Sequence, residues 1–157
     1  MRMQLLALFI LIASCDEKST SPQQGRVDEN EIYSGGVPRD GIPALTNPEF
    51  IAAADASYLG VSDLVLGLVI DGEARAYPVK ILNYHEIVND TFLNGSICIT
   101  YCPLTGSGMA HSRVIDGQES EFGVSGLLFR NNLIPYDRVT ESLYSQMYGK
   151  GIRGDHR

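Results

Sequence analysis

The sequence predicts a β-rich α+β fold, in which Asp-Gly hairpins build a curved antiparallel sheet accompanied by one or two short helices. Two pairs, Asp71-Gly72 and Asp116-Gly117, are strong signals for two-residue hairpin turns. The run at 64–70 is apolar and rich in β-branched residues, and residues 73–77 alternate with period two. Together these features predict at least one well-formed β-hairpin.

The length and charge of the chain limit what it does. Its 157 residues are enough for one domain with a real hydrophobic core. The formal net charge is −7, and basic residues do not cluster. Such an acidic surface argues against nucleic acid as a partner and against electrostatic docking to anionic lipid. Whether the partner is a protein or a small molecule stays open.

The N-terminus has the pattern of a bacterial lipoprotein signal peptide. Arg2 supplies a positive charge, and the apolar run at 3–13 is too short for a membrane span of about 20 residues. Small residues precede Cys15, as in the lipobox, where the cysteine carries fatty-acid chains such as palmitate and becomes the new N-terminus. The alternative is an ordinary signal peptide in which Cys15 occurs by chance.

These features divide the chain into a lipoprotein signal peptide at 1–14, a lipidated cysteine with a disordered tether at 15–30, and one β-rich domain at 31–157. Between 16 and 30, Val27 is the single large apolar residue, which is typical of a tether. We expect the protein in the cell envelope, outside the cytoplasm and held to the membrane by lipid. Asp16 favours the periplasmic face of the inner membrane if the cell is Gram-negative.

The first half of the domain predicts a turn, a helix and a hairpin. Two prolines and a glycine make 38–43 a turn, and Asn47-Pro48 is a good helix start for a short amphipathic helix at 49–58. Pro78 closes the second hairpin strand. Residues 79–83 then form one helical turn that delivers His85.

The second half predicts further strands. Residues 96–101 have the pattern of a buried strand, 102–108 of a tight loop, and 109–115 of a returning strand. Asp116-Gly117 turns the chain into a third strand at 119–124, so these strands are expected to form a meander. Another strand is expected at 133–136.

Chemically useful residues concentrate between 83 and 108. This stretch holds His85, which is one of only three histidines in the chain. It also holds Glu86, Asp90, Cys98 and Cys102. In an extended strand the two cysteines lie about 13 Å apart, beyond the Cα separation of about 4.4–6.8 Å that a disulfide bridges. The density of these groups predicts a functional site lined by His85 and Cys102.

Six ordered motifs carry a resemblance to a known family. They are Pro38-Arg39-Asp40-Gly41-Ile42-Pro43-Ala44-Leu45, Ala74-Arg75-Ala76-Tyr77-Pro78, Leu82-Asn83-Tyr84-His85-Glu86-Ile87-Val88-Asn89-Asp90, Thr100-Tyr101-Cys102-Pro103-Leu104, Phe122-Gly123-Val124-Ser125-Gly126-Leu127-Leu128 and Tyr136-Asp137-Arg138. Through them the chain resembles the domain of unknown function 3179 family over roughly 36–151.

The resemblance implies a fold unit and a set of motif positions, but no established reaction. It implies that His85, Glu86 and Cys102 are family features. Two positions depart from the family pattern, since His111 stands where an aromatic residue is usual and Thr105 where many relatives have a second cysteine. Relatives also usually continue past the position of Gly151, which implies a member truncated at its C-terminus.

Three hypotheses follow for the site. The first is metal binding by His85 and Cys102, with Met109 as a further candidate ligand and Cys98 or His111 as alternatives. An imidazole, a thiolate and a thioether suit copper or another transition metal, and zinc if acids join.

The second hypothesis is thiol chemistry, in which Cys102 is the nucleophile or redox thiol, His85 its base, and Glu86 or Asp90 the group that orients the imidazole. The third is a ligand-binding or interaction module without catalysis, in which these residues serve turns, caps and the core. The sequence has no Walker loop and no dinucleotide fingerprint, so a nucleotide cofactor is not expected.

Overall fold

The structure is a computed structural model that describes residues 27–157. The expectations for the signal peptide, for Cys15 and for most of the tether concern residues outside this range. Where the tether was expected to continue, Val27 is buried, with 6% of its surface exposed, and packs against Ile134 and Tyr136. Within 27–157, no helix has both the length and the apolar character needed to cross a membrane.

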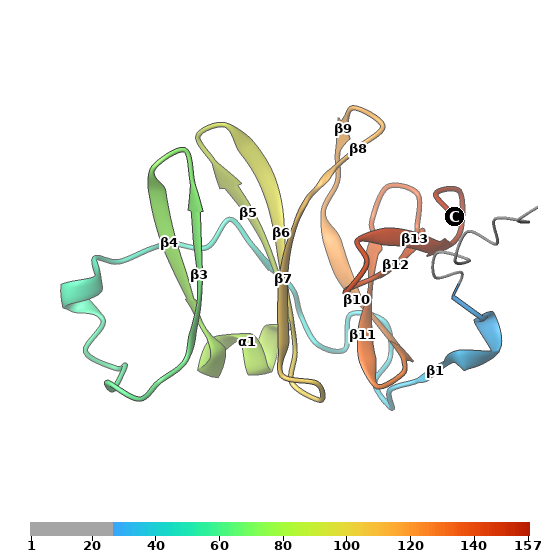
Figure 1. The fold of residues 1–157 in the computed structure, drawn as a ribbon, viewed down its shortest axis with the longest axis horizontal. Helices are drawn as coiled ribbons and strands as arrows, with labels where there is room; N and C mark the ends of the chain where they lie inside the picture. The colour runs from blue at the N-terminus through green and yellow to red at the C-terminus, as the bar shows by residue number, and fades with distance from the viewer. Residues whose placement is uncertain (1–26) are drawn as a thin grey trace, which may run out of the picture.

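The described residues form mainly β-strands (Figure 1). The strands are β1 (Ile32–Ser34), β2 (Leu45–Thr46), β3 (Val65–Ile70), β4 (Glu73–Pro78), β5 (Ile87–Phe92), β6 (Gly95–Cys102), β7 (Ser107–Ser112), β8 (Val114–Ile115), β9 (Gln118–Glu119), β10 (Phe122–Phe129), β11 (Asn132–Asp137), β12 (Leu143–Ser145) and β13 (Lys150–Arg153). The helices are α1 (Val79–His85) and two 3₁₀ turns, η1 (Glu29–Glu31) and η2 (Ala53–Asp55).

The strands form two larger sheets and two hairpins. The five-stranded sheet has the order β1-β10-β11-β12-β13 and is antiparallel, and the four-stranded sheet has the order β2-β5-β6-β7, with β2 parallel to β5. The pairs β3-β4 and β8-β9 each stand alone. The β-rich fold with curved antiparallel sheets and a single short α-helix confirms the predicted fold class.

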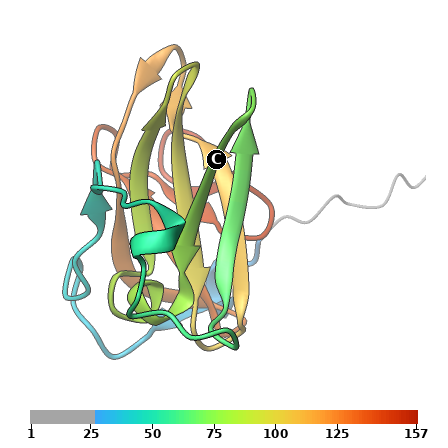
Figure 2. The same cartoon turned by 90° about the vertical axis from the view of Figure 1, so that its left-hand side faces the viewer.

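The four-stranded sheet lies between the other two layers (Figures 1 and 2). One face packs on the five-stranded sheet through Ile87, Cys98 and Cys102 on one side and Phe122 and Val124 on the other. On the opposite face, Val88 and Ile99 pack against apolar residues of the β3-β4 hairpin and α1, namely Leu66, Leu68, Tyr77 and Leu82. Two apolar layers thus lie on either side of the four-stranded sheet, and a third cluster, with Val27 and Ile134, lies on the far face of the five-stranded sheet.

Local chemistry explains the confirmed elements. The predicted hairpin is β3-β4, in which both turn residues have positive φ, 50° at Asp71 and 85° at Gly72, as a type I′ turn requires. The expected helical turn is α1, which follows Pro78 and ends at His85. The strand expected at 133–136 lies within β11.

The helix expected at 49–58 was wrong. Only the three-residue turn η2 forms there, and the chain around it is irregular. Phe50 and Ile51 are 42% and 57% exposed, so the segment buries little apolar surface against the sheet. A short helix depends on tertiary packing, and the Asn47-Pro48 start signal does not supply it.

The predicted three-strand meander was also wrong. The strands β6 and β7 pair as expected, but β10 joins β11 and β1 in the other sheet. The chain leaves β7 at the buried Arg113, whose carbonyl accepts a 2.8 Å hydrogen bond from the N–H of Ser120. This closes the small β8-β9 hairpin and carries the chain from one sheet to the other.

Candidate functional site

His85 and Cys102 lie at neighbouring ends of α1 and β6. Strand β5 pairs Ile87 with Thr100, and the N–H of Tyr101 donates a 2.7 Å hydrogen bond to the carbonyl of Glu86, so the end of α1 lies beside the end of β6. The hydrogen bonds of the two side chains go elsewhere. His85 Nδ1 is 2.8 Å from the carbonyl oxygen of Pro43, and Cys102 Sγ is 3.6 Å from that of Asn131.

Glu86 occupies the position where helix changes to strand. Its φ is 56°, and its N–H donates a 2.8 Å hydrogen bond to the carbonyl of Leu82, which ends α1. Such a conformation is unusual for a residue with a side chain. Burial raises the pKa of the Glu86 carboxyl above its usual value. Glu86 therefore has the strained backbone and perturbed carboxyl typical of functional positions, although such features also occur at structural turns.

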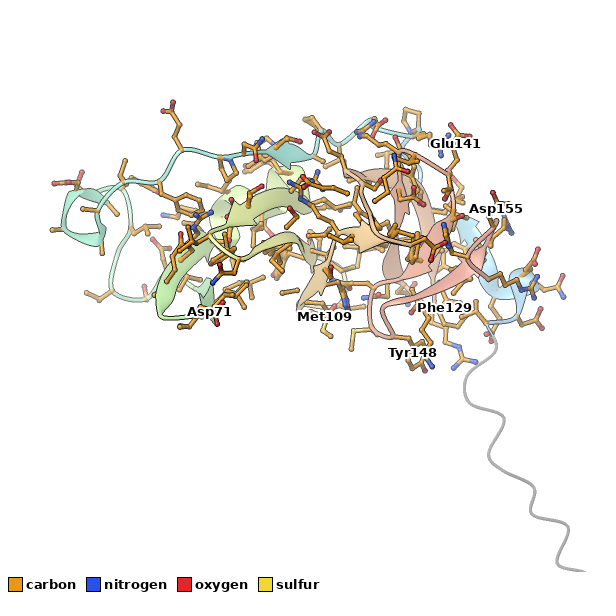
Figure 3. The ribbon with its side chains drawn as sticks, turned by 90° about the horizontal axis from the view of Figure 1, so that it is seen from above. Asp71, Met109, Phe129, Glu141, Tyr148 and Asp155 are labelled. Carbon is orange, nitrogen blue, oxygen red and sulfur yellow. The ribbon has the colours of Figure 1, made fainter. Side chains whose placement is uncertain are left out.

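The two cysteines of β6 lie on the same face of the four-stranded sheet as three side chains of β7, two of which are candidate metal ligands. Cys98 pairs with His111, Thr100 with Met109, and Cys102 with Ser107. In Figure 3, Met109 lies between Asp71 at the hairpin tip and Tyr148 along the length of the molecule. Within 27–157, no group of three or more histidine, cysteine or acidic side chains is placed to hold a metal ion.

Both cysteines are free thiols in the core. Cys98 is 2% exposed and Cys102 1% exposed. Burial raises the pKa of Cys98 to about 12, against a smaller opposing effect of the Arg113 charge. A buried thiol of this kind is unreactive at neutral pH.

A buried polar network surrounds the end of β6, and the sequence analysis missed it. Gln146 is fully buried, and its side-chain oxygen accepts hydrogen bonds from Ser107 (2.9 Å) and Asn132 (2.6 Å). Its side-chain nitrogen donates to Thr100 (3.1 Å). Asn132 also donates to Thr105 (3.0 Å), which ties the loop after Cys102 to β11. No local sequence pattern marks Gln146, because its partners come from distant strands.

Two acidic motif residues form ion pairs. Asp40 accepts hydrogen bonds from Tyr136 (2.6 Å) and from Arg138 (2.8 and 3.0 Å). Although partial burial opposes it, hydrogen bonding to these two residues holds the pKa of Asp40 below its usual value. The close approach of the chains also requires glycine at 123, where a Cβ would lie 2.5 Å from the Tyr136 ring. This motif cluster fastens the 38–43 turn to β10 and β11.

The second acidic motif residue, Asp90, joins the four-stranded sheet to β4. Its carboxylate accepts hydrogen bonds from Arg75 (2.5 Å) and Tyr77 (2.6 Å). The Arg75 guanidinium also pairs with Glu73 (2.5 Å) and lies over the rings of Phe92 (4.3 Å) and Phe50 (4.7 Å). Burial, together with the bond to Asp90, raises the pKa of Tyr77, so its hydroxyl stays protonated.

A large groove lies next to this ion-pair cluster. It has a volume of about 850 Å³ and runs between β4, the end of β3, α1 and the irregular segment 48–61. We call it the β4 groove. The following residues are representative of its apolar walls: Phe50, Ile51, Val61, Val65, Ile81 and Leu82. This volume is within the range of small-molecule sites.

A smaller cavity of about 290 Å³ collects Cys98 and His111 with Tyr144 and His156. His111 Nε2 is 2.9 Å from the carbonyl oxygen of Gln146. His156 Nδ1 is 3.6 Å from the Asp116 carboxylate, and its Nε2 is buried without a hydrogen-bond partner among the described residues. Of the candidate ligands predicted from the sequence, Cys98 and His111 therefore line one cavity, and His85 and Cys102 lie at adjacent chain ends with their side chains bonded to different segments.

Comparison with known proteins gives one match. No curated protein and no solved structure matches the chain. A family model described as "Protein of unknown function (DUF3179)" matches residues 39–157, which include both acidic motif clusters, the β4 groove, His85 and Cys102. The chain belongs to this family, as its six ordered motifs predict.

Proposed function

We propose that this protein is a lipid-anchored, extracytoplasmic binding module whose ligand site is the β4 groove. The observation that carries the proposal is the groove itself, about 850 Å³ in volume and walled mainly by apolar side chains. Ligand sites are concave and mostly apolar, with a few polar groups that fix orientation. Here Arg75, Tyr77 and Glu73 supply those polar groups.

The surroundings of the groove support this use. Val61 is fully exposed and Phe50 is 42% exposed, and both line the groove, while Leu64, next to Val65 of the lining, is 73% exposed. Clusters of exposed apolar side chains mark ligand or interaction sites, because they leave apolar surface in contact with water. A bound apolar ligand removes this surface from water.

The anchor follows from the N-terminal sequence. The apolar run at 3–13 and the small residues before Cys15 support lipidation there, and Asp16 supports the inner-membrane periplasmic face in a Gram-negative cell. Cys15→Ser should release the protein from the membrane fraction. Continued membrane attachment of that variant would contradict lipidation at Cys15.

Occupancy of the groove can be read with a single tryptophan, because the chain contains none. Phe50→Trp places the reporter in the wall of the groove, and Val139→Trp places one on an exposed loop outside it. The lipidated protein in phosphatidylcholine vesicles is titrated with 4-bromobenzyl alcohol, a neutral aromatic that quenches tryptophan on contact. We expect saturable quenching at 50 and only linear, collisional quenching at 139. Linear quenching at both positions would overturn the proposal.

A second candidate function is a copper-type site at His85 and Cys102. The observation that favours it is the meeting of the ends of α1 and β6, with Met109 on the same face of the sheet as Cys102. An imidazole, a thiolate and a thioether are ligands that suit Cu(I). Metal content after anaerobic Cu(I) loading tests it, with His85→Ala expected to lose the metal and the distant His156→Ala to keep it.

A further inference from the structure

We propose that the β4 groove takes an extended apolar peptide carrying basic residues, which pairs with the free edge of β4 as an added strand. This inference rests on the proposed function and specifies its ligand. Peptides bind sheet edges in this way because main-chain hydrogen bonds supply affinity and alternate side chains fill neighbouring pockets. Three features of β4 support it, namely its hydrogen-bond pattern, its mostly open edge and its charge.

The hydrogen-bond pattern shows which backbone groups of β4 face the groove. The β3-β4 register pairs Leu68 with Arg75 and Leu66 with Tyr77, and the N–H of Val79 donates a 2.9 Å hydrogen bond to the carbonyl of Leu64. In an antiparallel pair, bonded and non-bonded positions alternate. The odd-numbered residues of β4 therefore bond to β3.

The N–H and C=O groups of Ala74 and Ala76 consequently point away from β3. Both residues are exposed and line the β4 groove. Strand β4 pairs with β3 alone, and among residues 27–157 no hydrogen bond uses the backbone of Ala74 or Ala76 on this side. Four backbone groups thus face the groove in the orientation that an added strand needs.

Most of the free edge of β4 is open to such pairing. Sheet edges are usually protected by proline, by charged side chains or by a covering segment. Here Pro78 occupies the last open position of β4 and cannot donate, but the open positions before it are Ala74 and Ala76. The one basic side chain, Arg75, turns inward to Asp90. Phe50 of the opposite wall contacts the side chains of Arg75 and Tyr77, but among the described residues no hydrogen bond from this wall reaches the backbone of Ala74 or Ala76.

The charge of the groove favours a peptide with basic residues. The charged residues that line the groove are Glu49, Glu73 and Arg75, and the charge of Arg75 is already paired with Asp90 and Glu73. The whole chain carries a formal charge of −7. A basic residue beside Glu49 is attracted, and an acidic one is repelled. Strand β4 is six residues long, about 20 Å, which fits a peptide of about seven residues.

The test uses a fluorescein-labelled peptide of alternating valine and alanine with a lysine at each end. Its binding to the lipidated protein in phosphatidylcholine vesicles is measured by anisotropy, with empty vesicles subtracted. Ala76→Pro removes one N–H that faces the groove, and Val69→Pro removes one from the opposite, solvent-facing edge of the same hairpin. We expect Ala76→Pro to weaken binding about tenfold, and Val69→Pro to leave it unchanged.

Methylated peptides give a second test on the unaltered protein. N-methylation of alternate residues in one register removes the N–H groups that face β4, and in the other register removes those that face away. Only one register should abolish binding. Equal effects of both registers, or of Ala76→Pro and Val69→Pro, would overturn strand addition. Equal binding of a peptide with glutamate at each end would overturn the charge assignment.

Other results separate this inference from the proposed function. Saturable quenching of Phe50→Trp by 4-bromobenzyl alcohol without any peptide binding would overturn the assignment of a peptide as the ligand. The β4 groove would then remain a ligand site. Failure of both probes would overturn both proposals. A dimer of the protein that Ala76→Pro dissociates would identify a second copy as the occupant of β4 and so overturn the peptide assignment.

Discussion

The two faces of the four-stranded sheet are used differently. The face toward the five-stranded sheet is mostly closed, since Ile87, Cys98 and Cys102 are buried there and Asn89 and Gln146 are hydrogen-bonded. Its one described hollow is the cavity of about 290 Å³ beside Cys98. The face toward the β3-β4 hairpin is closed at its centre and opens into the β4 groove at one side. Residues with reactive chemistry therefore lie mainly in the closed layer, and the accessible site is walled by apolar side chains.

Many of the motif residues hold together segments that are distant in the sequence. Asn89 forms a pair of hydrogen bonds with the backbone of Phe122 and so links the two sheets, as Asp40 links the 38–43 turn to Tyr136 and Arg138. Each sits where two segments distant in sequence meet. Substitutions in the closed layer should therefore lower the free energy of unfolding. Substitutions on the open side should change ligand binding.

The largest expected effect concerns the cysteines. Because Cys98 and Cys102 are buried, alkylation by iodoacetamide at pH 8 should require opening of the core. We expect both thiols to react at least 100-fold more slowly in the folded protein than in urea, since global opening costs several kcal/mol. Mass spectrometry of Cys98→Ser and Cys102→Ser follows each thiol separately. Fast reaction of Cys102 in the folded protein would favour the thiol-chemistry hypothesis.

The next effect concerns the link between the sheets. Asn89→Leu removes hydrogen bonds of 2.8 Å and 2.7 Å and leaves the buried N–H and C=O of Phe122 without partners. We expect the free energy of unfolding to fall by about 2–4 kcal/mol. Urea unfolding followed by circular dichroism measures it. Asn94→Ala, which loses one exposed hydrogen bond to Asp71, is the matched control and should cost under about 0.5 kcal/mol.

A smaller effect concerns Asp137, the buried carboxylate at the end of β11. Burial opposes its ionisation, but hydrogen bonds from Thr140 and Val139 outweigh it and lower the pKa of Asp137. A carboxyl whose pKa is lower in the folded state stabilises the fold above the unfolded value of about 4, and this stability is lost as the pH falls below it.

Asp137→Asn should therefore cost about 1–2 kcal/mol at pH 7. It should also reduce the loss of stability between pH 4 and pH 2. Melting temperatures across that range measure both effects. The exposed Asp155→Asn serves as the control and should keep the acid-dependent loss of the unaltered protein. An unchanged acid profile in Asp137→Asn would contradict the role of this carboxylate.

The sequence predicted much of the fold because its signals are local. Asp71-Gly72 fixes its hairpin within a few residues, and the short helix before His85 begins directly after Pro78. The failures were non-local, since nothing near Phe122 shows that its strand joins another sheet, and the start signal at Asn47 does not show that 49–58 lacks a packing surface.

The site was harder to predict than the fold for the same reason. His85 and Cys102 were chosen for their chemistry, and the structure places them at adjacent chain ends. The β4 groove depends on the separation between β4 and the 48–61 segment, which no motif encodes. The role of Gln146 depends on its hydrogen bonds with Ser107 of β7 and Asn132 of β11, which are distant from it in the sequence.

The smallest effect on stability should come from the wall of the β4 groove, where the effect on binding is large. Val61 is fully exposed, so Val61→Ser removes no buried contact and should change the free energy of unfolding by less than about 0.5 kcal/mol. In the Phe50→Trp background the same substitution should weaken binding of 4-bromobenzyl alcohol several-fold. The groove then offers the ligand less apolar surface to contact. Val139→Ser, half-exposed and outside the groove, should change neither quantity. A loss of stability with unchanged quenching would mean that residue 61 supports the fold, and that the open side is built like the closed one.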